Sequence, residues 1–148
     1  LCGLPRPIGI FWYTPSPSNL RCLPDQSFGS GATRGEMTVH IVEDDDGVRD
    51  ALSELCKSVG CKVRLYPDGE TFGAGVDVSP TDVVLVDLGL PGEHGTEVIR
   101  RIKALPMPPR VIVISGLPLA DIHFAMREFA NVAVMRKPLT SELLSLLM

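Results

Sequence analysis

Five chemically reactive side chains stand out because each lies at or just after the end of a short apolar segment. They are Glu43, Asp44, Asp87, Ser115 and Lys137. Three carboxylates held close together repel one another, and a divalent cation relieves that repulsion. Carboxylates offer only oxygen atoms as ligands, so the preferred ion is Mg²⁺, with water molecules completing its octahedral coordination. A carboxylate nucleophile, an ammonium and a hydroxyl beside such an ion are the parts needed to hold a phosphoryl group during transfer.

These side chains can act together only if the apolar segments before them form one parallel sheet. Strands are expected at 38–42, 62–66, 82–86, 110–114 and 132–135. Apolar residues at helical spacing, or weaker helix signals, lie between and after them, at 48–59, 68–74, 95–105, 122–129 and 141–148. Five strand-then-helix units predict an α/β fold with a doubly wound five-stranded parallel sheet. Ligands of such a sheet bind outside the carboxyl ends of its strands, where the five side chains would converge.

Local signals add detail to this pattern. Gly60 is expected to end the helix that begins after the acidic run, and Asp46 is expected to be its N-cap residue. His40 alternates with core residues and is interpreted as a buried, hydrogen-bonded histidine. Cys56 and Cys61 are interpreted as small apolar core fillers, because the chain has no CxxC pair.

Composition excludes several classes of protein. The chain has 148 residues, of which 45% are hydrophobic, and its formal net charge is −4. The negative charge argues against direct nucleic-acid binding, which usually needs a basic surface. No apolar run approaches the roughly 18–20 residues that span a bilayer. We therefore expect a cytoplasmic protein that does not bind membranes.

The chain divides near Met37. Residues 1–36 hold five Pro, five Gly and four Ser and show no sustained periodicity. We expect this segment to be a disordered or non-native N-terminal extension, since the chain opens with Leu and Met37 directly precedes the first strand. Residues 37–148 are expected to form the folded domain, with its last helix truncated, because a mean helix has about 11–12 residues.

Residues 37–148 resemble the response-regulator receiver domain of two-component signalling, and its FixJ-type branch in particular. Four ordered segments carry the resemblance: VHIVEDD at 39–45, LVDLGLPG at 85–92, VISG at 113–116 and RKP at 136–138. The resemblance implies a flavodoxin-like (βα)5 sheet with strand order 2-1-3-4-5. It also implies that Asp87 accepts a phosphoryl group from the phosphohistidine of a sensor histidine kinase. Mg²⁺ would be held by Asp44 and Asp87, by Glu43 directly or through water, and by the backbone carbonyl of Gly89.

The resemblance assigns roles to the remaining site residues as well. Lys137 would contact a phosphoryl oxygen, and the Lys137–Pro138 peptide bond would be cis. Ser115 would move to hydrogen-bond the phosphoryl group and so couple the chemistry to a change in conformation that controls an output, transcription. The domain would be regulatory and not an enzyme, apart from assisting its own phosphorylation and dephosphorylation. The face formed by the fourth helix, the fifth strand and the last helix would bind a partner or a second copy.

Two other functions remain open. A Mg²⁺-dependent phosphohydrolase could use Asp87 as its nucleophile, but it would usually need an acid two residues later, where Gly89 stands. Such an enzyme would also need a cap over its substrate, and no insertion in the chain is long enough to form one. A degenerate receiver would bind a partner without being phosphorylated, and the presence of Asp87 and Lys137 argues against it.

Overall fold

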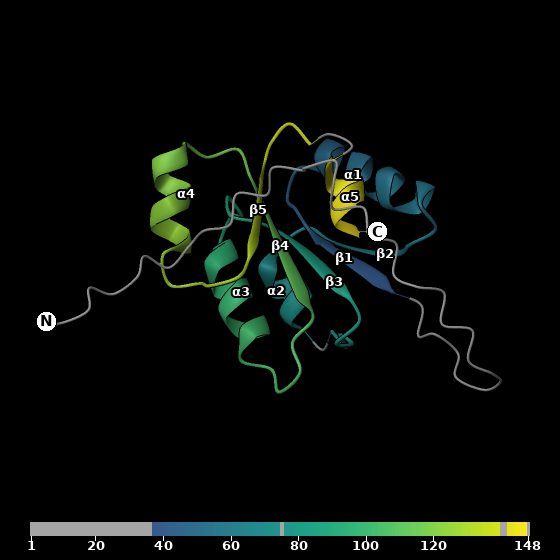
Figure 1. The fold of residues 1–148 in the computed structure, drawn as a ribbon, viewed down its shortest axis with the longest axis horizontal. Coiled ribbons are helices and arrows are strands. Elements are labelled where there is room, and N and C mark those ends of the chain that lie inside the picture. The colour runs from purple at the N-terminus through teal and green to yellow at the C-terminus, as the bar shows by residue number, and fades with distance from the viewer. Residues whose placement is uncertain (1–36, 75, 140–141, 148) are drawn as a thin grey trace, which may run out of the picture.

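A five-stranded parallel sheet with helices on both faces makes up the described part of the chain, residues 37–74, 76–139 and 142–147 of a computed structural model (Figure 1). The elements, in chain order, are β1 (Thr38–Val42), α1 (Asp46–Ser58), β2 (Lys62–Tyr66), α2 (Gly69–Gly73), β3 (Val83–Asp87), α3 (Gly95–Lys103), β4 (Arg110–Ser115), α4 (Leu119–Met126), β5 (Ala133–Arg136) and α5 (Glu142–Leu147). The strand order is β2-β1-β3-β4-β5, and neighbouring strands are parallel. The doubly wound sheet and its strand order are confirmed. The expectation for residues 1–36 concerns a segment outside the described residues.

The helices divide into two layers, each covering an apolar cluster. Helices α1 and α5 lie on one face of the sheet, and α2, α3 and α4 lie on the other (Figure 1). All residues of β3 are buried, as a strand covered on both faces should be. Among the described residues, no helix is long and apolar enough to cross a bilayer.

Helix α1 begins one residue earlier than the predicted cap allows. Asp45, and not Asp46, is the N-cap residue, and its Oδ1 accepts a hydrogen bond of 2.9 Å from the Val48 N–H. Asp45 has the extended backbone that a cap needs, whereas Asp46 already lies in the first helical turn. There Asp46 forms an ion pair with Arg49. The prediction of Asp46 was therefore wrong by one residue.

A buried hydrogen-bond network links the start of β1 to the loop before β3. His40 lies 3.0 Å from the Tyr66 hydroxyl through Nδ1 and 3.2 Å from Asp82 Oδ2 through Nε2. Asp82 also accepts hydrogen bonds from the N–H groups of Thr38 and Ser79, at 3.0 and 2.8 Å. Burial raises the pKa of Asp82, but its donors outweigh burial and hold the pKa below its ordinary value. The interpretation of His40 as a buried, hydrogen-bonded residue is confirmed.

Candidate functional site

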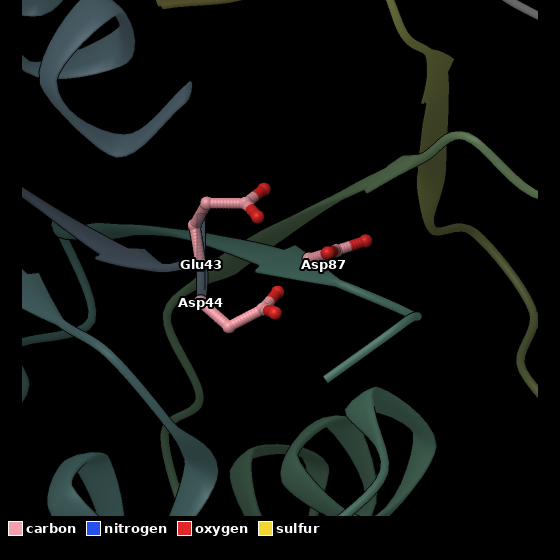
Figure 2. A group of neighbouring side chains, drawn as sticks. All are labelled: Glu43, Asp44 and Asp87. Carbon is pink, nitrogen blue, oxygen red and sulfur yellow. The ribbon is translucent and has the colours of Figure 1, made fainter. Parts of the chain in front are cut away.

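Three carboxylates meet at the carboxyl edge of the sheet. Glu43 and Asp44 follow the last residue of β1, and Asp87 is the last residue of the adjacent strand β3 (Figure 2). One carboxylate oxygen from each residue lies within 4.8 Å of those of the other two. Glu43 and Asp87 are buried, while Asp44 is exposed. The parallel pairing of β1 with β3 therefore brings residues more than forty positions apart in the sequence into one acidic cluster.

An ammonium group lies against two of these carboxylates. Lys137 Nζ is 2.8 Å from Glu43 Oε2 and 3.1 Å from Asp87 Oδ2. The backbone N–H of Lys137 donates to the Ser115 carbonyl at 2.9 Å, which holds the start of the β5–α5 loop against the end of β4. The Lys137–Pro138 peptide bond is cis, as predicted.

The electrostatics of the cluster are those of a site with excess negative charge. Burial raises the pKa of Glu43 above its ordinary value, and the nearby Asp87 carboxylate raises it further, against the opposing effects of Lys137 and the Asp45 N–H. Burial alone would lower the pKa of Lys137, but the Glu43 and Asp87 carboxylates outweigh it and the pKa is raised. Lys137 therefore stays charged, and one ammonium does not fully offset the acids around it.

Ser115 and Gly89 also lie at the carboxyl edge of the sheet, and their hydrogen bonds differ. Ser115 is fully buried at the end of β4, and its hydroxyl oxygen accepts a hydrogen bond of 3.1 Å from the Leu117 N–H. The Gly89 N–H donates to Asp87 Oδ1 at 3.1 Å and so fixes the orientation of that carboxylate. The role of the Gly89 carbonyl as a metal ligand stays a prediction.

The donor set fits a hard divalent cation. All three carboxylates offer oxygen ligands, which Mg²⁺ prefers. The buried Glu43 Oε2 has an ion-pair contact with Lys137 but no aligned hydrogen bond, so one of its lone pairs is left for another partner. Glu43 Oε1 is already used, because it accepts from the Asp45 N–H at 3.1 Å. Glu43, Asp44 and Asp87 would therefore suit Mg²⁺ better than a soft metal.

Two residues that support the cluster were missed by sequence reasoning. The Arg49 guanidinium donates to the Glu43 carbonyl at 2.8 Å and approaches the Asp44 carbonyl at 3.5 Å, so it holds the loop that carries both acids. Gly95 is needed because a Cβ there would overlap the backbone carbonyl of Asp87. The signals were weak: Arg49 has the spacing of an ordinary helix surface residue, and Gly95 looks like any glycine at a helix start.

Most of the described chain is similar to known proteins. Residues 39–147 match the response regulator receiver domain family. The chain is 38% identical over 111 residues to a cyclic di-GMP phosphodiesterase of Thermotoga maritima, covering 74% of this chain and 29% of that protein. It is 31% identical over 85 residues to the transcriptional regulatory protein FixJ of Bradyrhizobium diazoefficiens, covering 55% of this chain and 42% of that protein. The chain thus spans less than half the length of these two relatives.

Solved structures show the same fold. The FixJ-N crystal structure aligns with a TM-score of 0.61 at 27% identity, over 75% of this chain and 89% of that chain. The response regulator DrrB, an OmpR/PhoB homologue of Thermotoga maritima, aligns with a TM-score of 0.62 at 27% identity, over 73% of this chain and 48% of that chain. The matched region, residues 39–147, contains every residue of the candidate site.

Proposed function

Because the chain belongs to the response regulator receiver domain family, whose members are regulatory phosphoacceptor domains of two-component signalling, we propose that Asp87 accepts a phosphoryl group from a sensor histidine kinase. One observation carries the proposal. The Asp87 carboxylate is buried at the end of β3, 3.1 Å from Lys137 Nζ, with oxygens of Glu43 and Asp44 beside it. The Asp87 carboxylate, an ammonium and two further carboxylates are the parts that phosphoryl transfer to an aspartate would use.

The proposed transfer forms an acyl phosphate. A carboxylate oxygen of Asp87 attacks the phosphorus atom, the bond from phosphorus to the kinase histidine nitrogen breaks, and the imidazole leaves. Lys137 already lies on Asp87 Oδ2 and would move its hydrogen bond to a phosphoryl oxygen, where its charge offsets the added negative charge. When bound by Glu43, Asp44, Asp87 and the Gly89 carbonyl, Mg²⁺ would supply further positive charge to the phosphoryl oxygens.

Ser115 is the proposed link between phosphorylation and conformation. Its hydroxyl oxygen now accepts from the Leu117 N–H in the loop that leads to α4. Turning the hydroxyl toward a phosphoryl oxygen would break this hydrogen bond and release the β4–α4 loop. The chemistry at Asp87 would then reach α4.

By the same proposal, the partner surface lies on α4, β5 and α5. The protein would act in the cytoplasm, and transcription would be the output that it regulates. Two large apolar side chains support a partner surface at α4, since Leu119 is 45% and Phe124 is 67% exposed. A homodimer through this face is one form the partner could take.

A phosphohydrolase is less well supported, since Gly89 occupies the position where its second acid would stand.

The test is the intact mass of the protein after incubation with acetyl phosphate, in Mg²⁺ and in EDTA. We expect one phosphoryl adduct, of about 80 Da, that forms in Mg²⁺ and not in EDTA. Asp87→Asn should abolish it, and Asp50→Asn on the exposed surface of α1 is the matched control that should keep it. An adduct at full level in Asp87→Asn would refute the phosphoacceptor assignment. No adduct in a folded wild-type sample would favour the degenerate receiver.

A further inference from the structure

We propose that Cys56 and Cys61 form a second chemical site, a dithiol that an anionic disulfide such as glutathione disulfide converts to an intrachain disulfide. The site lies at the C-terminal end of α1 and the start of β2, whereas the acidic cluster lies beyond the opposite end of α1. It does not depend on the phosphoacceptor role. The bond would join the end of α1 to the residue before β2. Helix α1 packs against β2 (Figure 1).

The turn between the two cysteines brings them together. Gly60 has φ +84°, the left-handed conformation that ends a helix, as predicted from its position. The Gly60 N–H donates to the Lys57 carbonyl at 3.0 Å and the Cys61 N–H donates to the Cys56 carbonyl at 3.2 Å. These are the two hydrogen bonds of a Schellman motif, in which the side chains at the positions of Cys56 and Cys61 usually touch.

Bond geometry limits the separation of the pair to about the upper end of the disulfide range. With 3.2 Å between the Cys61 nitrogen and the Cys56 oxygen, standard bond lengths keep the two Cα atoms within about 7 Å. Disulfides span Cα separations of roughly 4.4–6.8 Å. Both side chains also pack in the same apolar cluster, Cys56 as a buried member and Cys61 as a partly buried residue against it.

Electrostatics agree with this proximity. Burial, with a smaller contribution from a negative charge on Cys61, raises the pKa of the Cys56 thiol to about 11. Burial also raises the pKa of Cys61. Both thiols are therefore protonated at neutral pH, and oxidation should speed up as the pH rises toward 9.

Only one of the two thiols is open to a reagent. Cys56 is fully buried, whereas Cys61 is partly exposed. Cys61 lines a surface hollow of about 470 Å³ together with Thr38, Lys57, Lys62, Val63 and Arg64. Three of these residues carry positive charge and none of the described lining residues is acidic, so this lining favours an anionic reagent.

The reaction has two balanced steps. The Cys61 thiol loses its proton and attacks one sulfur of glutathione disulfide, so that one glutathione thiolate leaves and a mixed disulfide forms. The Cys56 thiol then loses its proton and attacks the Cys61 sulfur, which releases the second glutathione. The two cysteines are oxidised, and one glutathione disulfide is reduced to two glutathione molecules.

The experiment uses the full chain carrying Cys2→Ser and Cys22→Ser, so that only the candidate pair remains. After incubation with glutathione disulfide at pH 8.5, we expect a mass loss of about 2 Da and a proteolytic peptide pair joined through Cys56 and Cys61. Raising the salt concentration should slow this oxidation severalfold, and it should not slow oxidation by the cationic disulfide cystamine.

Single variants separate the steps and guard against misfolding. Cys56→Ala should stop at a stable glutathione adduct on Cys61, and Cys61→Ser should remain unmodified, with circular dichroism confirming that each variant is folded. A stable glutathione adduct on Cys61 in the presence of Cys56 would overturn the proposal, because it would show the thiols to be out of reach. Oxidation by glutathione disulfide that does not depend on salt would overturn the preference for an anionic reagent.

Discussion

Replacing Asp82 by Asn removes the negative charge of a side chain whose hydrogen bonds connect the start of β1 to the loop before β3. In the wild type, Oδ1 accepts from the Thr38 N–H, and Oδ2 accepts from the Ser79 N–H and contacts His40 Nε2. An Asn side chain keeps one acceptor but turns an NH₂ group toward the Ser79 N–H, so two donors face each other. Hydrogen bonds to a charged group contribute about 1.5–3 kcal/mol each. We therefore expect Asp82→Asn to lower the free energy of unfolding by about 2–4 kcal/mol at pH 7.

The pH dependence gives this prediction its test. The pKa of Asp82 lies below its ordinary value of 3.8 in the folded protein, so its stabilising effect is complete above 3.8 and is lost as the pH falls through the folded value. Urea unfolding at pH 7, 5 and 3.5 should show a difference between wild type and variant that shrinks only at the lowest pH. Asp77→Asn, on an exposed residue of the same loop, is the matched control. A difference that is equally large at pH 7 and pH 3.5 would refute the reasoning.

Three further variants test the support of the acidic cluster by urea unfolding in EDTA. Glu43→Gln should raise the unfolding midpoint at neutral pH, because burial and Asp87 raise the Glu43 pKa and make its charge unfavourable. Well below pH 4.5, Glu43 is protonated in both the folded and the unfolded protein, so the gain should vanish. A gain that persists at such a low pH would contradict this prediction. Arg49→Met should cost about 1–2 kcal/mol through the lost hydrogen bond to the Glu43 carbonyl, and no loss would show that this contact does not hold the loop. Gly95→Ala should cost at least about 2 kcal/mol because its Cβ overlaps backbone atoms. Gly89→Ala is the matched control, since its Cβ would make only ordinary contacts at 3.7 Å, and equal losses for the two would be contradictory.

Periodicity was enough to predict the sheet and the edge that carries the acidic cluster. The strands are short apolar runs and the helices have one apolar stripe, so their order alone placed Glu43, Asp44 and Asp87 at one edge. The metal and phosphoryl roles of these residues stay predictions. The cap of α1 was harder, because three consecutive aspartates are equally good cap residues and only the backbone angles select Asp45.

Long-range polar contacts were not predictable from the pattern. His40 and Asp82 are 42 residues apart, and neither has a local signal that names the other. Arg49 reaches a backbone carbonyl, which carries no sequence signature. Gly60 was correctly predicted to end the helix, but the hydrogen bond from the Cys61 N–H to the Cys56 carbonyl depends on the turn type, which the residue pattern does not specify.

The strand order has a consequence for how the protein acquires its site during folding. The first strand pairs with the third, and Lys137 meets Asp87 across 50 residues of sequence, so the site is made of contacts that close large loops. Such contacts are slow to form, because the chain loses entropy before the contact stabilises it. A hairpin-sized or helix-sized intermediate would hold none of the cluster. Competence for the chemistry should therefore arise late, together with the pairing of β1, β3, β4 and β5, and should be lost in any opening that separates them.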